Sequence, residues 1–233
     1  MKLAIIGNGA MGKLVRTLAA DGGHEVARVI TSEDAARGMD ELVELLRGHD
    51  AAVDFSVASA VLKNIEAAAR AGVPLVEGTT GWNDGEQEAR RLVEAHAGAL
   101  VYGANFSVGV NLFYRVVARA AELFAATGYA PFIEEAHHSR KRDAPSGTAL
   151  KLRDVLAAHI MRDIPVASTR AGHIPGTHRV GFDSAADQIT LTHTARTREG
   201  FASGALLAAR WITGKRGVYE FSEVIDKIVT SDG

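Results

Sequence analysis

Short apolar runs alternate with amphipathic stretches along the first hundred residues. Residues 3–6 form a continuous apolar run that stops at a glycine, which predicts a buried parallel strand. Apolar residues between 11 and 18 then recur at helical spacing, and two glycines end that helix. The alternation continues with strands predicted at 26–30, 51–55, 75–77 and 99–102 and helices at 39–47, 58–71 and 86–97. This order is typical of a doubly wound parallel sheet of the Rossmann type.

The pattern changes after residue 105. Helices are predicted at 108–126 and 149–161, and the segments 132–135, 170–182 and 187–194 are rich in strand-forming residues. The last two strand-rich segments follow each other directly, which indicates an open, largely antiparallel or mixed sheet. Two closing helices are predicted at 205–212 and 220–229. We therefore expect an α/β chain with a second, α+β domain that begins near residue 106.

Composition sets broad limits. The chain has 233 residues, of which 47% are hydrophobic and 23% charged, as is ordinary for one large or two small globular domains. A net charge of −2 gives no general attraction to nucleic acid or to an anionic membrane. The chain has no cysteine, which excludes disulfides and thiolate metal sites and fits a reducing compartment. The N-terminal apolar stretch is too short for a signal peptide, and no run approaches the about 20 apolar residues of a membrane span. We expect a cytoplasmic protein.

The first predicted helix begins in a glycine-rich loop, Gly7-Asn8-Gly9-Ala10-Met11-Gly12. Its place between a first strand and a first helix is the context of a dinucleotide-binding fingerprint. Gly7 permits the tight turn, Gly9 lets the backbone approach a pyrophosphate, and Gly12 lets helix and strand pack closely. The alternative is a merely tight strand–helix turn.

The residues after the second strand bear on the choice of cofactor. An acid at this place normally binds the adenosine ribose, but Thr31 and Ser32 stand here. Two hydroxyls can bind a 2′-phosphate, which an acid would repel. The sequence therefore favours NADPH, while NADH stays open through Glu33.

Two more loops share the same edge of the predicted sheet, beyond the carboxyl ends of the strands. They are Phe55–Ser56 and Gly78-Thr79-Thr80-Gly81. The second offers backbone N–H groups and hydroxyls, with no bulky side chain to block a flat ring. We expect it to hold the amide of a nicotinamide; the alternative is an ordinary glycine-rich turn.

A basic stretch at 134–148 dominates the second half of the chain. Its cationic or titratable members are His137, His138, Arg140, Lys141 and Arg142. It ends in Pro145-Ser146-Gly147-Thr148, where a helix is predicted to begin, and a helix start with free N–H groups and hydroxyls suits an anion. Histidines and a lysine beside an anion site indicate proton transfer to a negatively charged small molecule. The alternative is a solvated basic loop capped by serine.

These residues also carry a family resemblance. The segment Glu135-Ala136-His137-His138, with Lys141 and the run Asp143–Ala149, resembles the signature of 4-hydroxy-tetrahydrodipicolinate reductase, an enzyme of the diaminopimelate and lysine pathway. Similar stretches follow the family order at 78–81, 104–111, 175–178 and 201–205, so the resemblance covers essentially the whole chain. It implies a dinucleotide-binding domain of residues 1–105 completed by C-terminal helices within 206–233. It also implies a domain of residues 106–205 that binds substrate and builds a homotetramer.

The resemblance implies roles for individual residues. His137 is similar to the catalytic acid/base and Lys141 to the proton donor. His138, Gly147 and Thr148 are similar to contacts with the substrate carboxylates. The implied cofactor contacts are Gly7 to Gly12, Gly78, Thr79, Thr80, Gly103, Ala104, Asn105 and Phe106. From the residues themselves we also expect Ser146, helped by Lys141, to bind a substrate carboxylate at the helix start, Phe55 to lie at the cofactor edge of the sheet, and Thr31 and Ser32 to lie at the ribose. The chain departs from the family in lacking an arginine in the glycine-rich loop and an acid directly after the second strand.

Three other functions are weighed against this one. A different Rossmann dehydrogenase would share the glycine-rich loop but has no need of the His137–Thr148 stretch. A non-catalytic NADP(H)-binding sensor would lose the proton-transfer residues. A metal enzyme is suggested by the histidines at 137, 138, 173, 178 and 193. However, neighbouring residues of a strand point to opposite faces, so we expect no metal and interpret His178 and His193 as hydrogen-bonded sheet residues.

Overall fold

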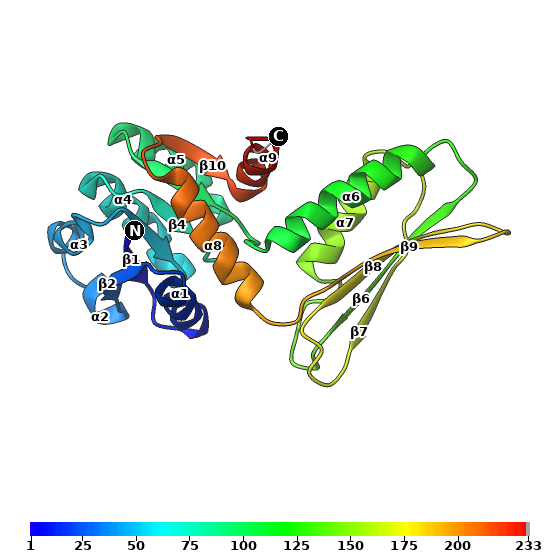
Figure 1. The fold of residues 1–233 in the computed structure, drawn as a ribbon, viewed down its shortest axis with the longest axis horizontal. Helices are drawn as coiled ribbons and strands as arrows, with labels where there is room; N and C mark the ends of the chain where they lie inside the picture. The colour runs from blue at the N-terminus through cyan, green and yellow to red at the C-terminus, as the bar shows by residue number, and fades with distance from the viewer. Residues whose placement is uncertain (232–233) are drawn as a thin grey trace. The chain divides into compact units, whose positions relative to one another are not determined.

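The computed structural model describes residues 1–231 and contains two compact units (Figure 1). The first unit comprises Met1–Ser107 and the chain from Glu199 onward, and the second comprises Val108–Arg198. Residues 232 and 233, the last two of the predicted C-terminal segment 206–233, lie outside the described residues. Within residues 1–231 we find no helix that combines the length and the apolar character needed to cross a membrane.

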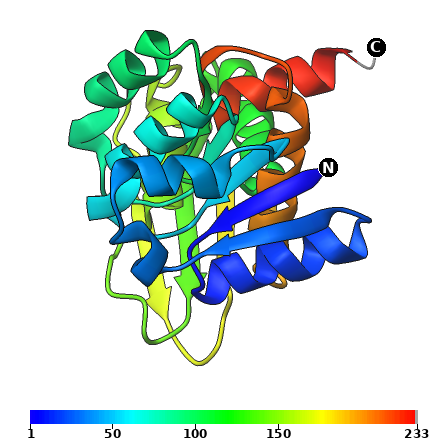
Figure 2. The same ribbon diagram turned by 90° about the vertical axis from the view of Figure 1, so that its left-hand side faces the viewer.

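The first unit is built on a six-stranded parallel sheet with the order β10-β5-β4-β3-β1-β2. Its strands are β1 (Lys2–Ile6), β2 (Glu25–Ile30), β3 (Ala51–Asp54), β4 (Leu75–Glu77), β5 (Ala99–Tyr102) and β10 (Gly217–Glu220). Figure 2 shows β1 and β2 side by side in this unit. The Rossmann-type sheet predicted from the alternating pattern is thus confirmed. The edge strand β10 was not predicted, because its four residues are only half-buried and lie just before a helix.

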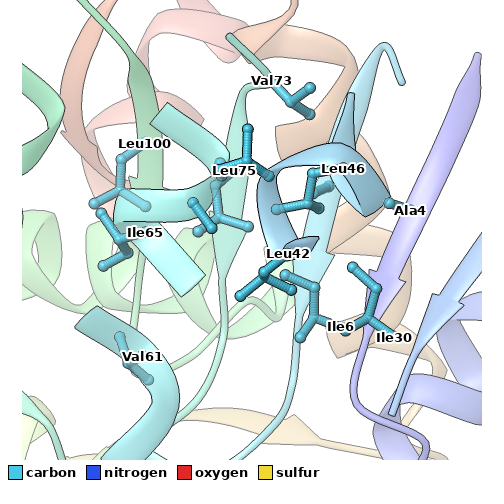
Figure 3. Close-up of a cluster of buried hydrophobic side chains, with 14 of the residues drawn as sticks. Ala4, Ile6, Ile30, Leu42, Leu46, Val61, Ile65, Val73, Leu75 and Leu100 are labelled. Atoms are coloured by element: carbon cyan, nitrogen blue, oxygen red, sulfur yellow. The ribbon is translucent and has the colours of Figure 1, made fainter. Parts of the chain in front are cut away.

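Helices cover both faces of this sheet. They are α1 (Ala10–Asp21), α2 (Ser32–Ala35), α3 (Met39–Leu46), α4 (Val61–Ala71), α5 (Glu86–Ala95), α8 (Glu199–Ile212) and α9 (Phe221–Ser231), with short 3-10 turns at Ala58–Ala60 and Asn83–Gly85. Residues of α3 and α4 pack against β1 and β4 in a cluster of aliphatic side chains that includes Ile6, Leu42, Leu46, Ile65 and Leu75 (Figure 3). All five are at most 1% exposed, so the strands are fixed by apolar burial. The carboxyl ends of the strands then present their loops at one edge.

The second unit carries a four-stranded sheet with the order β7-β6-β8-β9. Its elements are α6 (Val108–Phe124), β6 (Ala130–His137), α7 (Gly147–Ala157), β7 (Val166–Arg170), β8 (Thr177–Asp183) and β9 (Gln188–Thr194). The pair β6–β7 is parallel, whereas β6–β8 and β8–β9 are antiparallel, which confirms the predicted mixed sheet. Both helices pack on one face, where Val117, Ile133, Leu152 and Val180 form the core.

The strand-rich segment 170–182 is interrupted by a loop. β7 ends at Arg170, residues 171–176 form the loop, and β8 begins at Thr177. Gly172 and Gly176 adopt positive φ angles of 47° and 150°, which break the extended backbone. The preceding strand β7 was missed because its central residues are exposed and polar, so they carry no apolar alternation.

Candidate active site

The strand β6 delivers a histidine and an acid to the same buried face. Along β6, Pro131, Ile133, Glu135 and His137 are buried, while the residues between them are more exposed. Successive side chains of a strand alternate between faces, so Glu135 and His137 lie one above the other on the face that packs against α7. This placement brings two titratable groups into an environment from which water is largely excluded.

Three side chains form a connected set around Glu135. The carboxylate of Glu135 accepts a hydrogen bond from Nδ1 of His137 and two from the guanidinium of Arg170, at 2.6 Å (Nη2 to Oε1) and 3.0 Å (Nη1 to Oε2). The parallel register of β6 and β7 sets Arg170 beside His137 and Ser168 beside Glu135. Sequence reasoning had included neither Glu135 nor Arg170 among the site residues.

Electrostatics fix the protonation of this set. Burial alone would raise the pKa of Glu135, but hydrogen bonds from Arg170, Ser168 and His137 outweigh burial and lower that pKa to about 2. Burial lowers the pKa of His137, the Glu135 carboxylate opposes that change, and the charge of Lys141 adds to it. An ionised Glu135 can only accept, so the Nδ1 atom of His137 carries the hydrogen and the lone pair of the neutral ring lies on Nε2.

The Nε2 atom of His137 is left for another partner. Within residues 1–231 it makes no hydrogen bond, and 11% of the His137 side chain stays exposed. Gly176 lies against this atom: a Cβ at position 176 would sit 3.1 Å from Nε2. The glycine therefore leaves the space beside Nε2 free. This is the geometry of a general acid/base whose second nitrogen is held by a carboxylate.

The helix α7 begins next to this histidine. Ser146 caps α7, because its Oγ accepts the backbone N–H of Ala149 at 3.2 Å, and its own N–H donates to Glu135 at 3.3 Å. Its hydroxyl also bonds Nε2 of His178 at 3.1 Å, and Ser146 is only 2% exposed. The structure therefore does not favour the predicted direct contact of Ser146 with substrate, since its hydroxyl is already used in capping.

The next two residues keep free donors. The backbone N–H groups of Gly147 and Thr148 lie in the first turn of α7, where no intrahelical acceptor exists, and the described residues supply no other acceptor. Position 147 is exposed, with no neighbour within 4 Å of the place that a Cβ would take. The Thr148 hydroxyl bonds Tyr114 of α6. These two positions can bind an anion at the helix start.

The loop between β6 and α7 contributes a cation. Lys141 is partly buried and its Nζ lies 2.8 Å from Oδ1 of Asp143. Its charge also helps to lower the pKa of both His137 and His178, with burial as the larger cause in each case. His138 is half-buried beyond the end of β6, and its Nδ1 finds no partner within the described residues.

The interpretation of the other histidines holds for His178. This residue of β8 is 4% exposed and bonds Ser146, and burial lowers its pKa to about 4. His193 of β9 packs against Phe113, with ring centroids 5.9 Å apart, but its Nδ1 lacks a partner within the described residues. His178 is therefore a hydrogen-bonded residue of the sheet, whereas His193 is half-buried on the edge strand β9 and its predicted hydrogen bond is not seen at Nδ1.

One group of side chains has ligand spacing for a metal ion: Glu135, His137 and His178 each place one donor atom within 4.8 Å of the others. However, both oxygens of Glu135 face the guanidinium of Arg170, and a metal ion there would lie beside this positive charge. The donor set therefore does not fit a resident metal. That no metal takes part stays a prediction.

The first unit gathers the predicted dinucleotide loops. Gly7 has φ +98°, and a Cβ on it would lie 2.5 Å from the carbonyl oxygen of Phe55, while a Cβ on Gly12 would lie 2.1 Å from the carbonyl oxygen of Gly7. Gly9 precedes α1, where no side chain caps the first turn and nothing lies within 4 Å of its Cβ position. The cradle therefore fits a pyrophosphate, which would bind the free N–H groups.

The segment after β2 differs from expectation. Thr31 caps α2: its hydroxyl and its N–H both lie 3.0 Å from Oδ2 of Asp34, which accepts them. These hydrogen bonds lower the pKa of Asp34, and Arg28 and Arg37 each approach it at 3.5 Å. The Thr31 hydroxyl is therefore engaged with Asp34, whereas Ser32 is exposed; contact of either residue with a 2′-phosphate stays a prediction.

A cavity of about 250 Å³ lies between two of the predicted cofactor loops, and its lining includes Thr79, Thr80, Trp82, Tyr102, Gly103 and Ala104. The ring of Phe55 packs so closely on Gly78 that a Cβ there would clash at 2.2 Å. Phe106 is 2% exposed and packs between Phe55 and Phe221. Its ring is therefore a core residue, and any cofactor contact at this position would involve the backbone.

The fold and these sites together define an oxidoreductase that uses a nicotinamide dinucleotide. Family profiles agree: the profile described as "Dihydrodipicolinate reductase, N-terminus" matches residues 1–106, and that described as "Dihydrodipicolinate reductase, C-terminus" matches residues 109–225. The chain belongs to the dihydrodipicolinate reductase family.

Individual relatives span the whole chain. A protein of Christiangramia forsetii named 4-hydroxy-tetrahydrodipicolinate reductase is 32% identical and aligned over 98% of this chain and 99% of its own. A protein with the same name from Archaeoglobus fulgidus is 33% identical and aligned over 97% of this chain and 100% of its own. The solved structure of dipicolinate-bound dihydrodipicolinate reductase from Paenisporosarcina sp. TG-14 superposes with a TM-score of 0.79. The superposition covers 96% of this chain and 99% of that chain, at 21% sequence identity. The last comparison supports the fold.

Proposed function

We propose that this protein reduces 4-hydroxy-tetrahydrodipicolinate to tetrahydrodipicolinate with NADPH or NADH, in lysine biosynthesis through the diaminopimelate route. The overall change consumes one hydride and one proton and releases the 4-hydroxyl group as water. The observation that carries this proposal is the pair Glu135–His137, with a free Nε2, beside the free N–H groups of Gly147 and Thr148 in the first turn of α7. It combines a proton-transfer group with an anion site, as a dicarboxylate substrate requires.

The residues of the second unit take defined roles in this proposal. The N–H groups of Gly147 and Thr148 bind one carboxylate of the substrate, and Lys141 neutralises charge beside it. His138 contacts the other carboxylate. His137 carries a proton on Nε2 to the reacting ring or the departing hydroxyl, while the Glu135 carboxylate stabilises the charged imidazole.

The first unit would hold the cofactor, which supplies hydride when bound. The N–H groups at the start of α1 bind its pyrophosphate, and the loop Gly78–Thr80 with Gly103 and Ala104 surrounds its nicotinamide in the 250 Å³ cavity. The residues present fit this group. Gly7 and Gly12 have no side chains, and a side chain at either position would fill the space that the pyrophosphate needs.

NADPH is the proposed preference, and the structure supports it through two arginines rather than through the Thr31 hydroxyl. The Thr31 hydroxyl is occupied, but Asp34, one of two acids after the end of β2, is approached by Arg28 and Arg37. These guanidinium groups reduce the repulsion that Asp34 would exert on a 2′-phosphate and can themselves bind it. The exposed Ser32 remains a hydrogen-bond donor for the same group.

Assembly and location form a further part of the proposal. In the second unit α6 and α7 both pack on one face of the sheet, so the opposite face, with Phe132 and Glu134, has no helix from this unit. We propose that it forms the contact of a homotetramer, which light scattering on the purified protein would test. A cytoplasmic location fits the absence of cysteine.

The first experiment is a coupled assay. A purified synthase makes the substrate from pyruvate and aspartate semialdehyde, and oxidation of NADPH and of NADH is followed by absorbance. Oxidation that requires the synthase product would support the reaction, and the ratio of the rates would give the cofactor preference. Binding of cofactor without any oxidation would favour a sensor. Oxidation with other small carboxylates, but not with this product, would favour a different dehydrogenase.

A further inference from the structure

Two carboxylic side chains are completely buried beneath the cofactor loops of the first unit. Asp54 ends β3 and Glu77 ends β4, and each has 0% exposure. The two residues are direct partners in the parallel register of these neighbouring strands. Carboxyl groups are almost never fully buried without a cation or a ligand, so this pair requires a physical explanation.

Hydrogen bonds to these carboxyl groups leave one oxygen without a partner. Asp54 accepts the N–H of Ser56 at 2.8 Å and the side-chain amide of Asn64 at 2.7 Å. Glu77 accepts the N–H of Thr79 at 2.7 Å through Oε1, but its Oε2 is buried without a donor. An ionised Glu77 would leave that oxygen charged and unsatisfied, whereas a protonated Glu77 can use it to donate to Asp54.

The polar and charged side chains on neighbouring elements do not neutralise the negative charge of this pair. Lys63 of α4 donates to two backbone carbonyls before α3. Tyr102 pairs with Glu77 in the register of β4 and β5, but its hydroxyl is bound to Glu86 and Arg90. Burial and the neighbouring Asp54 carboxylate both raise the pKa of Glu77. Two like charges at paired ends of adjacent strands cannot both be retained in the interior.

The two carboxyl groups hold the loops that follow them. The N–H of Ser56 bonds both Asp54 and the hydroxyl of Thr79, the latter at 3.1 Å, so the loops after β3 and β4 are linked directly. The carbonyl of Thr79 in turn accepts Nε1 of Trp82 at 2.9 Å, and both residues line the 250 Å³ cavity. The position of this cavity wall therefore depends on the buried pair.

We propose that Asp54 and Glu77 share a single proton, and that this proton fixes the loops at 55–56 and 78–80 in the arrangement that binds the nicotinamide end of the cofactor. Both are positioning residues, since neither needs to touch the cofactor. The inference rests on the proposed function only in placing the cofactor at this edge of the sheet. Loss of the proton places two buried charges on adjacent strand ends, which separates the loops and weakens cofactor binding.

The test uses Glu77→Gln, which replaces the protonated acid by an isosteric group. The amide oxygen still accepts Thr79 N–H and the amide nitrogen still donates to Asp54, but it cannot titrate. Cofactor dissociation constants are measured by fluorescence from neutral to alkaline pH for the wild type, Glu77→Gln and Glu94→Gln. Glu94 is exposed on α5 and is the matched control.

The expected result is a difference in pH dependence. At pH values above the pKa at which Asp54 and Glu77 lose their shared proton, the wild-type Kd for the cofactor rises by up to about tenfold per pH unit. It rises because only the protonated pair binds the cofactor well. Glu77→Gln keeps its neutral-pH Kd and lacks this rise, and Glu94→Gln behaves like the wild type. The cofactor's own titration is common to all three proteins and cancels in the comparison.

An infrared spectrum gives an independent readout. A protonated buried carboxyl group shows a C=O stretch separate from the amide bands, and we expect this band in the wild type at neutral pH and not in Glu77→Gln. Its absence from the wild type would overturn the shared proton even where the variant does not fold. Equal pH dependence of Kd in the wild type and Glu77→Gln would overturn the positioning role. A wild type that binds neither cofactor at any pH would instead contradict the proposed function.

Discussion

Nδ1 of His137 donates to the carboxylate of Glu135, two residues earlier on the same face of β6. The same carboxylate is held by the guanidinium of Arg170 from the next strand. The ring is therefore fixed in one orientation and one tautomer before substrate arrives. Its reactive nitrogen is the one that Gly176 leaves uncovered.

Glu135→Gln should lower kcat by about a hundredfold, within the usual range for general acid–base groups. An amide has one oxygen where His137 and Arg170 use two, so one of these bonds is lost. Removal of the negative charge also lowers the pKa of His137 further, because the Glu135 carboxylate raises it. His137 must be protonated to act as the acid, so the alkaline limb of the kcat/KM profile should move to lower pH.

The control is Glu134→Gln. Glu134 lies on the opposite face of β6, is 50% exposed and pairs with Arg179 at 3.1 Å. Its replacement should leave both kcat and the pH profile unchanged. An equal loss in the two variants would mean that the strand, and not the dyad, had been disturbed.

Gly176→Ala should lower both the stability of the protein and its kcat/KM, for two separate reasons. Its φ of +150° is unfavourable for a residue with a Cβ, at a cost of about 1–3 kcal/mol. The added methyl group would lie 3.1 Å from Nε2 of His137 and obstruct the proton's path.

Gly172→Ala separates the two effects. Gly172 belongs to the same loop and has φ +47°, but no atom lies within 4 Å of its Cβ position. It should lower the thermal midpoint with little change in kcat/KM. If Gly176→Ala, like Gly172→Ala, loses stability but keeps its kcat/KM, the assignment of Nε2 as the reactive atom would be contradicted.

Acidification should destabilise the protein through His178. In the unfolded chain this group takes up a proton near pH 6.5, whereas burial lowers its pKa in the folded protein to about 4. Between these values the unfolded state binds more protons, so the free energy of unfolding falls as the pH falls, by up to about 3 kcal/mol. Glu135, with a pKa lowered to about 2, adds a further loss below its usual 4.5.

Chemical denaturation at several pH values measures this contribution. His178→Gln can keep a hydrogen bond to Ser146 but cannot take up the proton, so its unfolding free energy should fall less between pH 6.5 and about 4. His159→Gln, at an exposed position, serves as control. Parallel curves for all three proteins would show that His178 does not titrate in this window.

The sequence predicted those parts of the fold whose signals are local. Gly7, Gly9 and Gly12 stand between an apolar strand and an amphipathic helix, and this order alone specifies a phosphate-binding turn. The motif from His137 to Thr148 likewise lies in one continuous segment, so its residue types and their spacing are enough to indicate its chemistry.

The parts that escaped prediction depend on pairing between distant segments. Arg170 reaches Glu135 only because β7 pairs with β6 in one register, and no local pattern specifies a register between strands 35 residues apart. The sequence shows Glu77 only as a polar strand end; its burial beside Asp54 becomes visible only when β3 and β4 pair in register. Ser146 is ambiguous for another reason: a serine before a helix can cap the helix or bind an anion, and only the structure shows that this one is buried and caps α7. Its contact with substrate stays a prediction.

His137→Gln should separate chemistry from binding. The amide keeps the size and polarity of the ring but cannot transfer a proton at neutral pH, so kcat should fall by about 10²–10⁴-fold while KM changes little. Lys141→Ala should lower kcat and raise KM together, because this cation also neutralises a carboxylate of the substrate. The kinetics of both variants are measured with synthase-generated substrate, with cofactor binding checked separately by fluorescence.

His137→Gln and Lys141→Ala should differ in KM but not in cofactor affinity. Cofactor affinity should be unchanged in both, because the dinucleotide loops belong to the first unit and His137 and Lys141 to the second. An unchanged kcat in His137→Gln would remove this residue from proton transfer and leave Lys141 as the donor. If instead both variants raise KM and keep kcat, the basic segment would be a binding site alone, and the proton would have to come from solvent.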